Sequence, residues 1–341
     1  MWRGACRPLA GCGALLAVAA GAAATERPEL TLPVDCEPGK SCFIQHYVDL
    51  DAGSATRDYM CGTATYDNHR GVDFRLLSAA ASAVGVPVRA ATGGTVKAVR
   101  DGVADAFRNA SNAPDIKGRE CGNGVVIDHG GGWETQYCHL KQGSVRVSKD
   151  QTVERGAHLG DVGFSGEADF AHLHFTVRHK DRVVDPFLPD AVDGACDRSR
   201  RTAGMWAPQI ATKLPYKAGE IIGWGFADAA PEYRALERNH EAISPPNALS
   251  PALLFYGRFI NLVAGDRVRV VIVGPGGSFA EELSLPIARN KPIVVSYAGK
   301  KRKSEPWRPG VYEGRVELLR DGAVIATRIA AISIAPAEAS R

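Results

Sequence analysis

Four histidines and one aspartate stand in three short clusters in the first half of the chain. The first cluster is His69-Arg-Gly-Val-Asp73, the second contains His139, and the third is His172-Leu-His174. Zinc prefers imidazole nitrogens and carboxylate oxygens, and a catalytic zinc site keeps three protein ligands with one position left for water. His69, Asp73 and one histidine of the last cluster would supply such a set. The sequence therefore predicts a catalytic zinc site.

The His-x-His spacing of the third cluster indicates a β-strand. Alternate residues of a strand point to the same face, so we expect His172 and His174 to enter one groove. Leu173 and Phe175 would then pack into the core behind them. One histidine would bind the metal while the other stands beside the water, and His139 would be a further imidazole next to the site.

In this order and spacing the three clusters resemble the signatures of the lysostaphin/LytM-type zinc metallopeptidases, a family of peptidoglycan DD-endopeptidase-like enzymes. Supporting stretches also match, so that the resemblance covers about residues 65–190; they are residues 122–129, 160–166 and 184–186. The combination is far more specific than any one motif.

The resemblance implies a role for each of five residues. His69, Asp73 and His174 would bind one Zn²⁺ per chain, while His139 and His172 would be catalytic, flanking the attacking water and the developing oxyanion. It implies an antiparallel β-domain with a groove across the sheet. It also implies hydrolysis of peptide bonds in peptidoglycan stems or cross-bridges by zinc-activated water.

Several positions depart from the family pattern without removing a ligand: Arg70, Cys138 and the segment Asp169-Phe170-Ala171. They leave the scissile bond open, and the sequence does not decide which of His139 and His172 acts as base. The alternative hypothesis is a non-catalytic LytM-type regulator or binding module that acts on other cell-wall hydrolases. Such proteins normally have substituted ligand positions, so the intact set favours the enzyme.

The remaining polar and aromatic candidates are assigned less specific roles. We predict that His129 is structural, because it lies at a hairpin turn, and that four histidines without a partner pattern are ordinary polar positions: His46, His158, His179 and His240. Three aromatic residues fit the core and the groove equally well: Tyr137, Phe164 and Phe170.

The elements that must position these residues are short β-type runs separated by glycines, which predict an all-β fold. A length of 341 residues favours more than one domain. We expect a lead-in at residues 25–60, the peptidase domain at 61–196, a linker at 197–215, and a small immunoglobulin-like β-sandwich at 216–336. This last domain would be accessory, with a possible role in gripping the wall or a protein partner.

Six cysteines beyond the first segment predict disulfides. Residues 125–127, the turn Gly130-Gly131-Gly132 and residues 133–137 predict a hairpin. The residue numbers of facing pairs in an antiparallel hairpin have a constant sum, so a hairpin in which Val126 faces Trp133 also places Cys121 opposite Cys138. The Cys121–Cys138 disulfide is therefore favoured. Cys36–Cys42 is then a plausible local loop, which leaves Cys61 for Cys196.

Residues 1–24 have the pattern of a secretory signal, with Arg3 and Arg7 ahead of an apolar stretch and a small-residue cleavage site. We expect a periplasmic or secreted protein without a transmembrane segment. Lipoprotein anchoring at Cys12 ranks lower, because the apolar stretch follows this cysteine instead of preceding it. The formal net charge of +3 falls to +1 when Arg3 and Arg7 are removed, which argues against nucleic acid as a partner.

Overall fold

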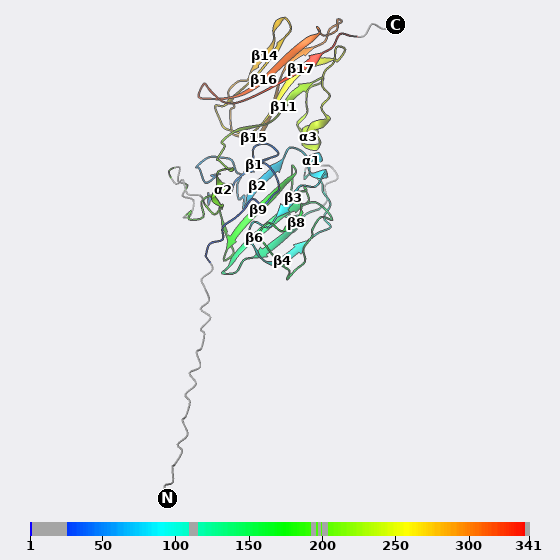
Figure 1. Cartoon of the computed structure of the whole chain (residues 1–341). Coiled ribbons are helices and arrows are strands. Elements are labelled where there is room, and N and C mark those ends of the chain that lie inside the picture. The colour runs from blue at the N-terminus through cyan, green and yellow to red at the C-terminus, as the bar shows by residue number, and fades with distance from the viewer. Residues whose placement is uncertain (2–25, 109–114, 192–195, 197–198, 200–203, 338–341) are drawn as a thin grey trace.

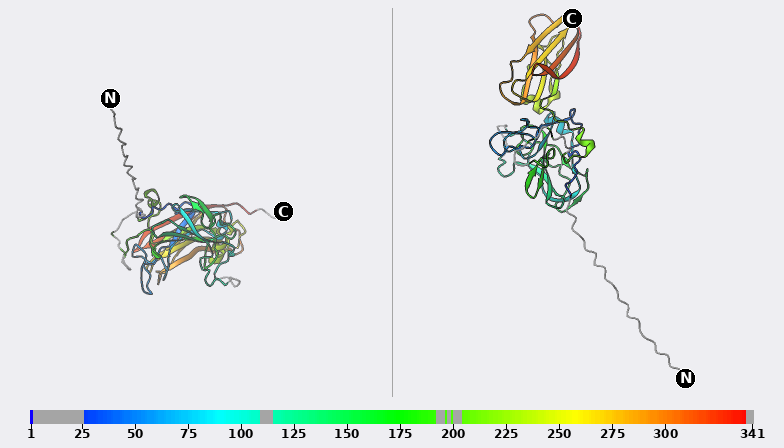
Figure 2. Two further views of the ribbon diagram at one scale, coloured as in Figure 1. Left: turned by 90° about the horizontal axis from the view of Figure 1, so that it is seen from below. Right: turned by 90° about the vertical axis from the view of Figure 1, so that its left-hand side faces the viewer.

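The computed structural model describes residues 1, 26–108, 115–191, 196, 199 and 204–337. The predicted signal segment and the alternative anchor at Cys12 lie outside these residues, apart from Met1. None of the helices in the described ranges has the length and apolar character required to span a bilayer. The described chain forms two lobes stacked end to end, with β1, α1 and α3 at their junction (Figures 1 and 2).

An antiparallel sheet is the frame of the first lobe. Its strands follow the order β1-β2-β9-β6-β5-β4-β7, with β10 paired to β9, while β3 and β8 form a separate ladder. The strands of this lobe are β1 (Cys42–His46), β2 (Val72–Leu76), β3 (Pro87–Arg89), β4 (Gly94–Arg100), β5 (Asn123–Asp128), β6 (Trp133–Leu140), β7 (Thr152–Val153), β8 (His158–Asp161), β9 (His172–His179) and β10 (Arg182–Val184).

The second lobe is a sandwich of two antiparallel sheets. One sheet has the order β11-β12-β15 and the other has the order β14-β13-β16-β17. This is an immunoglobulin-like arrangement in which β14 pairs with β13 in the second sheet. Its strands are β11 (Glu220–Ala227), β12 (Ala252–Leu262), β13 (Arg267–Gly274), β14 (Gly277–Leu283), β15 (Lys291–Lys301), β16 (Gly310–Arg320) and β17 (Ala323–Ile334). The predicted all-β class is confirmed.

The described helices are short and connect or cover strands. They are α1 (Ala79–Ala83), α2 (Pro208–Ala211), α3 (Tyr233–Arg238) and the 3₁₀ helix η1 (His240–Ala242). Ser78 precedes α1, and its hydroxyl oxygen lies 2.9 Å from the imidazole Nδ1 of His240. The helical segments nearest the junction therefore belong to both lobes (Figure 1).

Two segments outside the predicted peptidase domain contribute to the core of the first lobe. Leu30 forms a parallel bridge with Trp206, and both side chains are buried. Tyr216 packs on Tyr47 and donates a hydrogen bond to Asp58. The described parts of residues 25–60 and 204–216 are thus integrated into this lobe, because their apolar side chains complete its core.

The hairpin has a different register from the one predicted. Val126 lies opposite Gln136, not Trp133, because a wide turn with three left-handed glycines joins the strands: Gly130, Gly131 and Gly132. A bulge near Asn123 and the left-handed Gly122 then redirect the chain. The predicted Cys121–Cys138 disulfide forms at this bend, and Cys36–Cys42 and Cys61–Cys196 are also bonded.

Candidate metal centre

Three neighbouring strands place a row of polar side chains on one face of the sheet. Asp73 of β2 lies opposite His46 of β1 on one side and opposite His174 of β9 on the other. His69 precedes β2 and is also buried. The alternation of the strands turns Val72, Leu173 and Phe175 toward the core. The structure therefore brings His69, Asp73 and His174 together.

The candidate ligand atoms of these three residues lie within 4.8 Å of one another. Asp73 Oδ1 is 3.2 Å from His69 Nε2 and 2.8 Å from His174 Nδ1, and the two nitrogens are 3.2 Å apart. Ligands bound tetrahedrally at about 2.0–2.1 Å from zinc lie about 3.3 Å from each other. The two distances of 3.2 Å are close to this value, the distance of 2.8 Å is shorter, and the donor atoms are of the kind that zinc prefers.

Hydrogen bonds behind the two histidines select the nitrogen that each presents. His69 Nδ1 lies 2.6 Å from the carbonyl oxygen of Tyr47 and donates to it, which leaves Nε2 unprotonated and facing Asp73. His174 Nε2 lies 3.2 Å from Thr176 Oγ1, which leaves Nδ1 for the site. Such outer contacts orient metal-binding histidines in general.

Gly71 makes room for the ring of His174. A Cβ atom at position 71 would lie 2.6 Å from His174 Nε2 and 2.7 Å from the carbonyl oxygen of Phe175. Contacts of this length do not occur between real side-chain atoms and their neighbours, so the close approach of this segment to β9 requires glycine.

His46 belongs to the site, and its prediction as an ordinary polar position was wrong. Its Nδ1 donates a hydrogen bond of 2.9 Å to Asp73 Oδ2, the oxygen that does not face His69 and His174. No local motif marks His46, because it lies 27 residues before Asp73 and meets it only through the pairing of β1 with β2.

His139 and His172 stand side by side next to the three candidate ligands. Their ring centroids are 4.5 Å apart, and His172 Nε2 is 3.6 Å from Asp73 Oδ1. Each Nδ1 lies 2.8 Å from a backbone carbonyl oxygen, that of Ser165 for His139 and that of Phe170 for His172. His139 has a left-handed backbone conformation with φ 63°, which is uncommon outside glycine.

Burial and charge set the protonation of this cluster. Burial lowers the pKa of His172 to about 4. Burial also lowers the pKa of His139 well below its usual range, and the nearby imidazoles of His172 and His174 add to this shift. Burial alone would raise the pKa of Asp73, but His69 and the other surrounding imidazoles hold it well below its usual value. His139 and His172 are therefore neutral beside an ionised Asp73. Burial alone would lower the pKa of His69, but the neighbouring charge of Asp73 raises it.

The other predicted histidines lie elsewhere. His129 contacts Gly93 O and Thr135 Oγ1 through its two ring nitrogens, which agrees with a structural role. His158 pairs with Asp161, and His179 stacks on Trp133.

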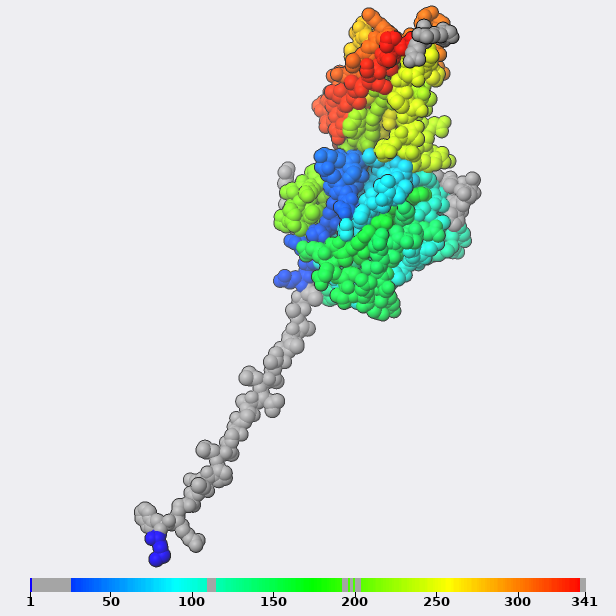
Figure 3. All heavy atoms as spheres, turned by 45° about the vertical axis from the view of Figure 1, so that its right-hand side comes forward, coloured from blue at the N-terminus to red at the C-terminus, as the bar shows by residue number. Residues whose placement is uncertain are grey.

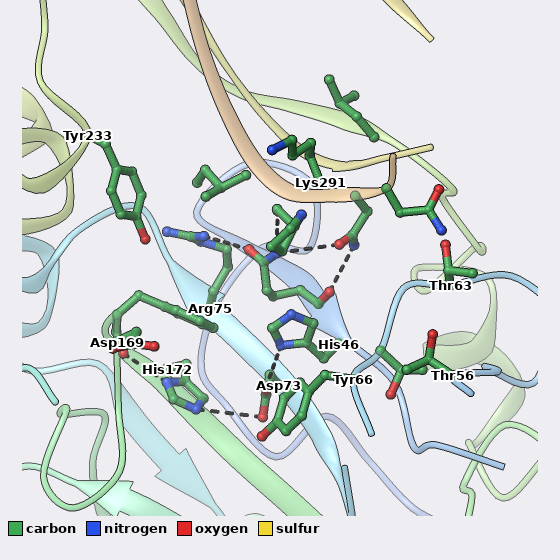
Figure 4. A pocket seen from close by; sticks show the side chains of 18 of the residues that line it. His46, Thr56, Thr63, Tyr66, Asp73, Arg75, Asp169, His172, Tyr233 and Lys291 are labelled. Atoms are coloured by element: carbon green, nitrogen blue, oxygen red, sulfur yellow. Dashed lines mark hydrogen bonds and ion pairs between the residues drawn. The ribbon is translucent and has the colours of Figure 1, made fainter. Parts of the chain in front are cut away.

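The three aromatic candidates have separate positions. Tyr137 is fully buried in the core, and its hydroxyl accepts a hydrogen bond from Ala91 N. Phe164 stacks on Phe107. Phe170 packs on His172 and lines a cavity of about 590 Å³ beside the site. Figure 4 shows this cavity with His46, Asp73 and His172 on its wall.

Comparison with known proteins assigns the domain that carries the site. Residues 67–186 match the model of peptidase family M23. Over 122 residues the chain is 32% identical to the peptidoglycan DD-endopeptidase ShyB of Vibrio cholerae. This alignment covers 36% of this chain and 23% of ShyB. Over 73 residues the chain is 41% identical to the cell division protein DipM of Caulobacter vibrioides, and this alignment covers 20% of this chain and 12% of DipM. The chain thus spans less than a quarter of the length of these relatives.

Part of the chain also aligns with solved structures. A zinc-containing peptidase from Vibrio cholerae is 27% identical, with 43% of this chain and 39% of that chain covered and a TM-score of 0.27. The family match includes all five residues predicted for the site: His69, Asp73, His139, His172 and His174. Residues 67–186 of this chain are therefore a peptidase family M23 domain.

Proposed function

We propose that the protein is an exported zinc metalloendopeptidase that hydrolyses peptide bonds of peptidoglycan stems or cross-bridges. The observation that carries this proposal is the convergence of His69, Asp73 and His174, whose ligand atoms lie within 4.8 Å inside the M23 domain. The similarity to peptidoglycan DD-endopeptidases supports wall peptides as the substrate class.

The proposed metal set is His69 Nε2, Asp73 Oδ1 and His174 Nδ1. Bound there, zinc would polarise the scissile carbonyl and lower the pKa of water toward about 7. His46 holds the free oxygen of Asp73, and the carbonyl of Tyr47 holds His69. These contacts keep the ligands oriented without further rearrangement.

His139 and His172 supply proton transfer in this proposal. Because each Nδ1 is directed at a backbone carbonyl, each Nε2 remains as a proton acceptor while the ring is neutral. An imidazole that has taken a proton from the attacking water becomes a donor for the developing oxyanion and the leaving amine. In this proposal either ring can perform either task.

Two measurements on the wild type, a ligand variant and a control variant test this function. We expect the purified protein to contain one zinc per chain by elemental analysis and to release new peptide products from purified peptidoglycan, identified by mass. His174→Ala should lose both properties. His158→Ala, which removes an imidazole paired with Asp161 outside the site, should keep them.

The alternative of a non-catalytic LytM-type regulator predicts the opposite result. A zinc-loaded wild type that releases no product from any peptidoglycan or glycine-containing peptide would contradict the enzyme. A regulator with a degenerate site should hold no zinc in either the wild type or His174→Ala.

A further inference from the structure

The cavity beside the metal centre lies between the two lobes. The first lobe contributes His46, Asp73 and His172 to its wall, and the second lobe contributes Asn261 and Lys291. In Figure 4 the backbone of the second lobe crosses above His46 and Asp73, with Lys291 on that side. A substrate that extends from the metal centre into this cavity would therefore also meet the second lobe.

Buried polar contacts hold this second wall in place. Arg75 of β2 donates hydrogen bonds of 2.9 and 2.8 Å to the two carboxylate oxygens of Glu237 in α3, and Arg258 of β12 donates to the same carboxylate. Gln45 Nε2 donates to the carbonyl oxygen of Pro292, the neighbour of Lys291, at 2.8 Å. Asn261 Nδ2 donates to the carbonyl oxygen of Gln45 at 2.9 Å. Lys291 is thus positioned relative to the metal centre by bonds on both sides of the junction.

Lys291 is a half-buried cation that has no counterion among the residues that the structure describes. Its side chain lines the cavity, and in the described part of the chain its ammonium has neither a hydrogen bond nor an ion pair. Arg75 also lines the cavity, and it shares the single carboxylate of Glu237 with Arg258, so this three-residue cluster carries a net positive charge. A partly desolvated cation of this kind is stabilised when an anionic group binds next to it.

The acidic residues of the cavity limit the kind of anion. Glu167 and Asp169 line it together with Asp73, so a polyanion would meet three carboxylates as well as Lys291. A peptide with an isolated carboxylate avoids most of this repulsion. The charge distribution therefore favours a peptide carboxylate over a phosphate-rich wall polymer.

We propose that this interlobe cavity holds a free carboxylate of the wall peptide and that Lys291 is its ion-pair partner, which makes the second lobe a determinant of substrate specificity. This inference rests on the proposed function. It adds a residue outside the M23 domain to the substrate site, because residues 67–186 do not include Lys291.

A matched set of peptides and variants tests the role of Lys291. The substrates are cross-linked wall peptides with free carboxylates and the same peptides converted to carboxamides. We expect the wild type to cleave the free form with a kcat/KM about 10-fold higher, mainly through a lower KM, and Lys291→Gln to lose this preference. Lys301→Gln, at the exposed far end of the same strand, should keep it.

The carboxamide peptide is the internal control for folding. Lys291→Gln should cleave it as fast as the wild type does, since only the carboxylate contact is removed. A Lys291→Gln protein that still prefers the free carboxylate would overturn the proposal. If the wild type cleaves neither peptide, it is the endopeptidase function that fails.

Equilibrium binding gives a second readout without turnover. In the zinc-loaded His139→Ala protein, we expect the free peptide to bind about 10-fold more tightly than the carboxamide, and the added Lys291→Gln substitution to make the two equal. Equal binding of both peptides before Lys291 is changed would contradict the ion pair.

Discussion

Both carboxylate oxygens of Asp73 make contacts with histidines of the site. Oδ1 faces His69 and His174, while Oδ2 accepts the hydrogen bond of His46 from the neighbouring strand. Because His46 is nearly buried and meets Asp73 at 2.9 Å, it restricts the rotation of the carboxylate. His46 is therefore a positioning residue for the proposed metal.

We predict that His46→Ala lowers the zinc affinity of the protein by about 10- to 100-fold, the usual effect of losing an outer hydrogen bond to a ligand. Competition with a chelator of known affinity measures this change. His46→Asn should recover part of the affinity, since its amide can donate to Asp73. His158→Ala is the matched control, and an unchanged dissociation constant in His46→Ala would contradict the role.

Asp185 is another buried carboxylate, and no cation pairs with it among the described residues. Burial raises its pKa to about 7, although the backbone amides of Phe187 and Leu188 oppose this shift. Its Oδ2 has no hydrogen-bond partner among the described residues. In the unfolded chain an aspartate titrates near the ordinary value of 3.8. Between these two values the folded state binds more protons at Asp185, so the contribution of this residue to stability falls as the pH rises from about 4 to about 7.

We predict that Asp185→Asn removes this contribution, so that the stability difference between the variant and the wild type changes with pH in this window. The difference between the two pKa values corresponds to about 4 kcal/mol across the window. Urea denaturation of chelator-treated protein at several pH values measures it, since chelation removes the effect of zinc loss in acid. The exposed Asp67→Asn should leave the slope unchanged, and an equal slope in wild type and Asp185→Asn would exclude Asp185 as its source.

The end of β6 shows how one element places a catalytic candidate. The chain leaves the strand through His139 in a left-handed conformation, and His139 N donates to the carbonyl oxygen of Cys121 at 2.8 Å. The neighbouring Cys138 is bonded to Cys121 itself. The disulfide thus fastens the two chain segments from which His139 projects toward His172.

We predict that replacing both Cys121 and Cys138 by serine lowers the free energy of unfolding by about 3 kcal/mol, because a loop with a sequence separation of 17 is released. The equivalent change at Cys36 and Cys42, with a separation of 6, should cost less, about 2 kcal/mol. Urea denaturation compares them. A larger loss for the shorter loop would contradict this account.

The two lobes are joined through a buried cluster of three charges. Glu237 is 3% exposed and receives both Arg75 and Arg258, each 1% exposed. The space-filling view shows the lobes in direct contact (Figure 3). Arg75 also lies over the ring of Phe170, which packs on His172. The junction and the candidate active site therefore share side chains.

We predict that Glu237→Gln destabilises the protein by about 3–5 kcal/mol, because two buried guanidiniums lose their only carboxylate in the cluster. Urea denaturation measures the loss, and peptidoglycan digestion should show lower activity through the shift of Phe170 and His172. Glu241→Gln, an exposed neighbour, is the control. Equal stability of Glu237→Gln and wild type would show that the cluster does not hold the lobes together.

Local patterns in the sequence determined the parts of this protein that depend on short spacings. The period of two in residues 172–175 predicted which side chains face the core, since a strand alternates its faces over any two residues. Glycine-bounded β-runs predicted the all-β class. The Cys121–Cys138 pair was also predicted, but from a hairpin register that the structure does not have, since Val126 lies opposite Gln136. Residue types and spacing predicted a zinc site of His69, Asp73 and one histidine of the last cluster, and only the resemblance to the LytM-type peptidases implied that this histidine is His174.

Only the tertiary structure decided the features that arise from contacts between distant segments. His46 joins Asp73, Leu30 meets Trp206, and Lys291 reaches the cavity of the first lobe, and no residue near these positions in sequence marks their partners. The hairpin register differed for a related reason, since the backbone of three consecutive glycines allows more than one turn width. Strand order and lobe docking bring such residues together, and these depend on the packing of the whole chain.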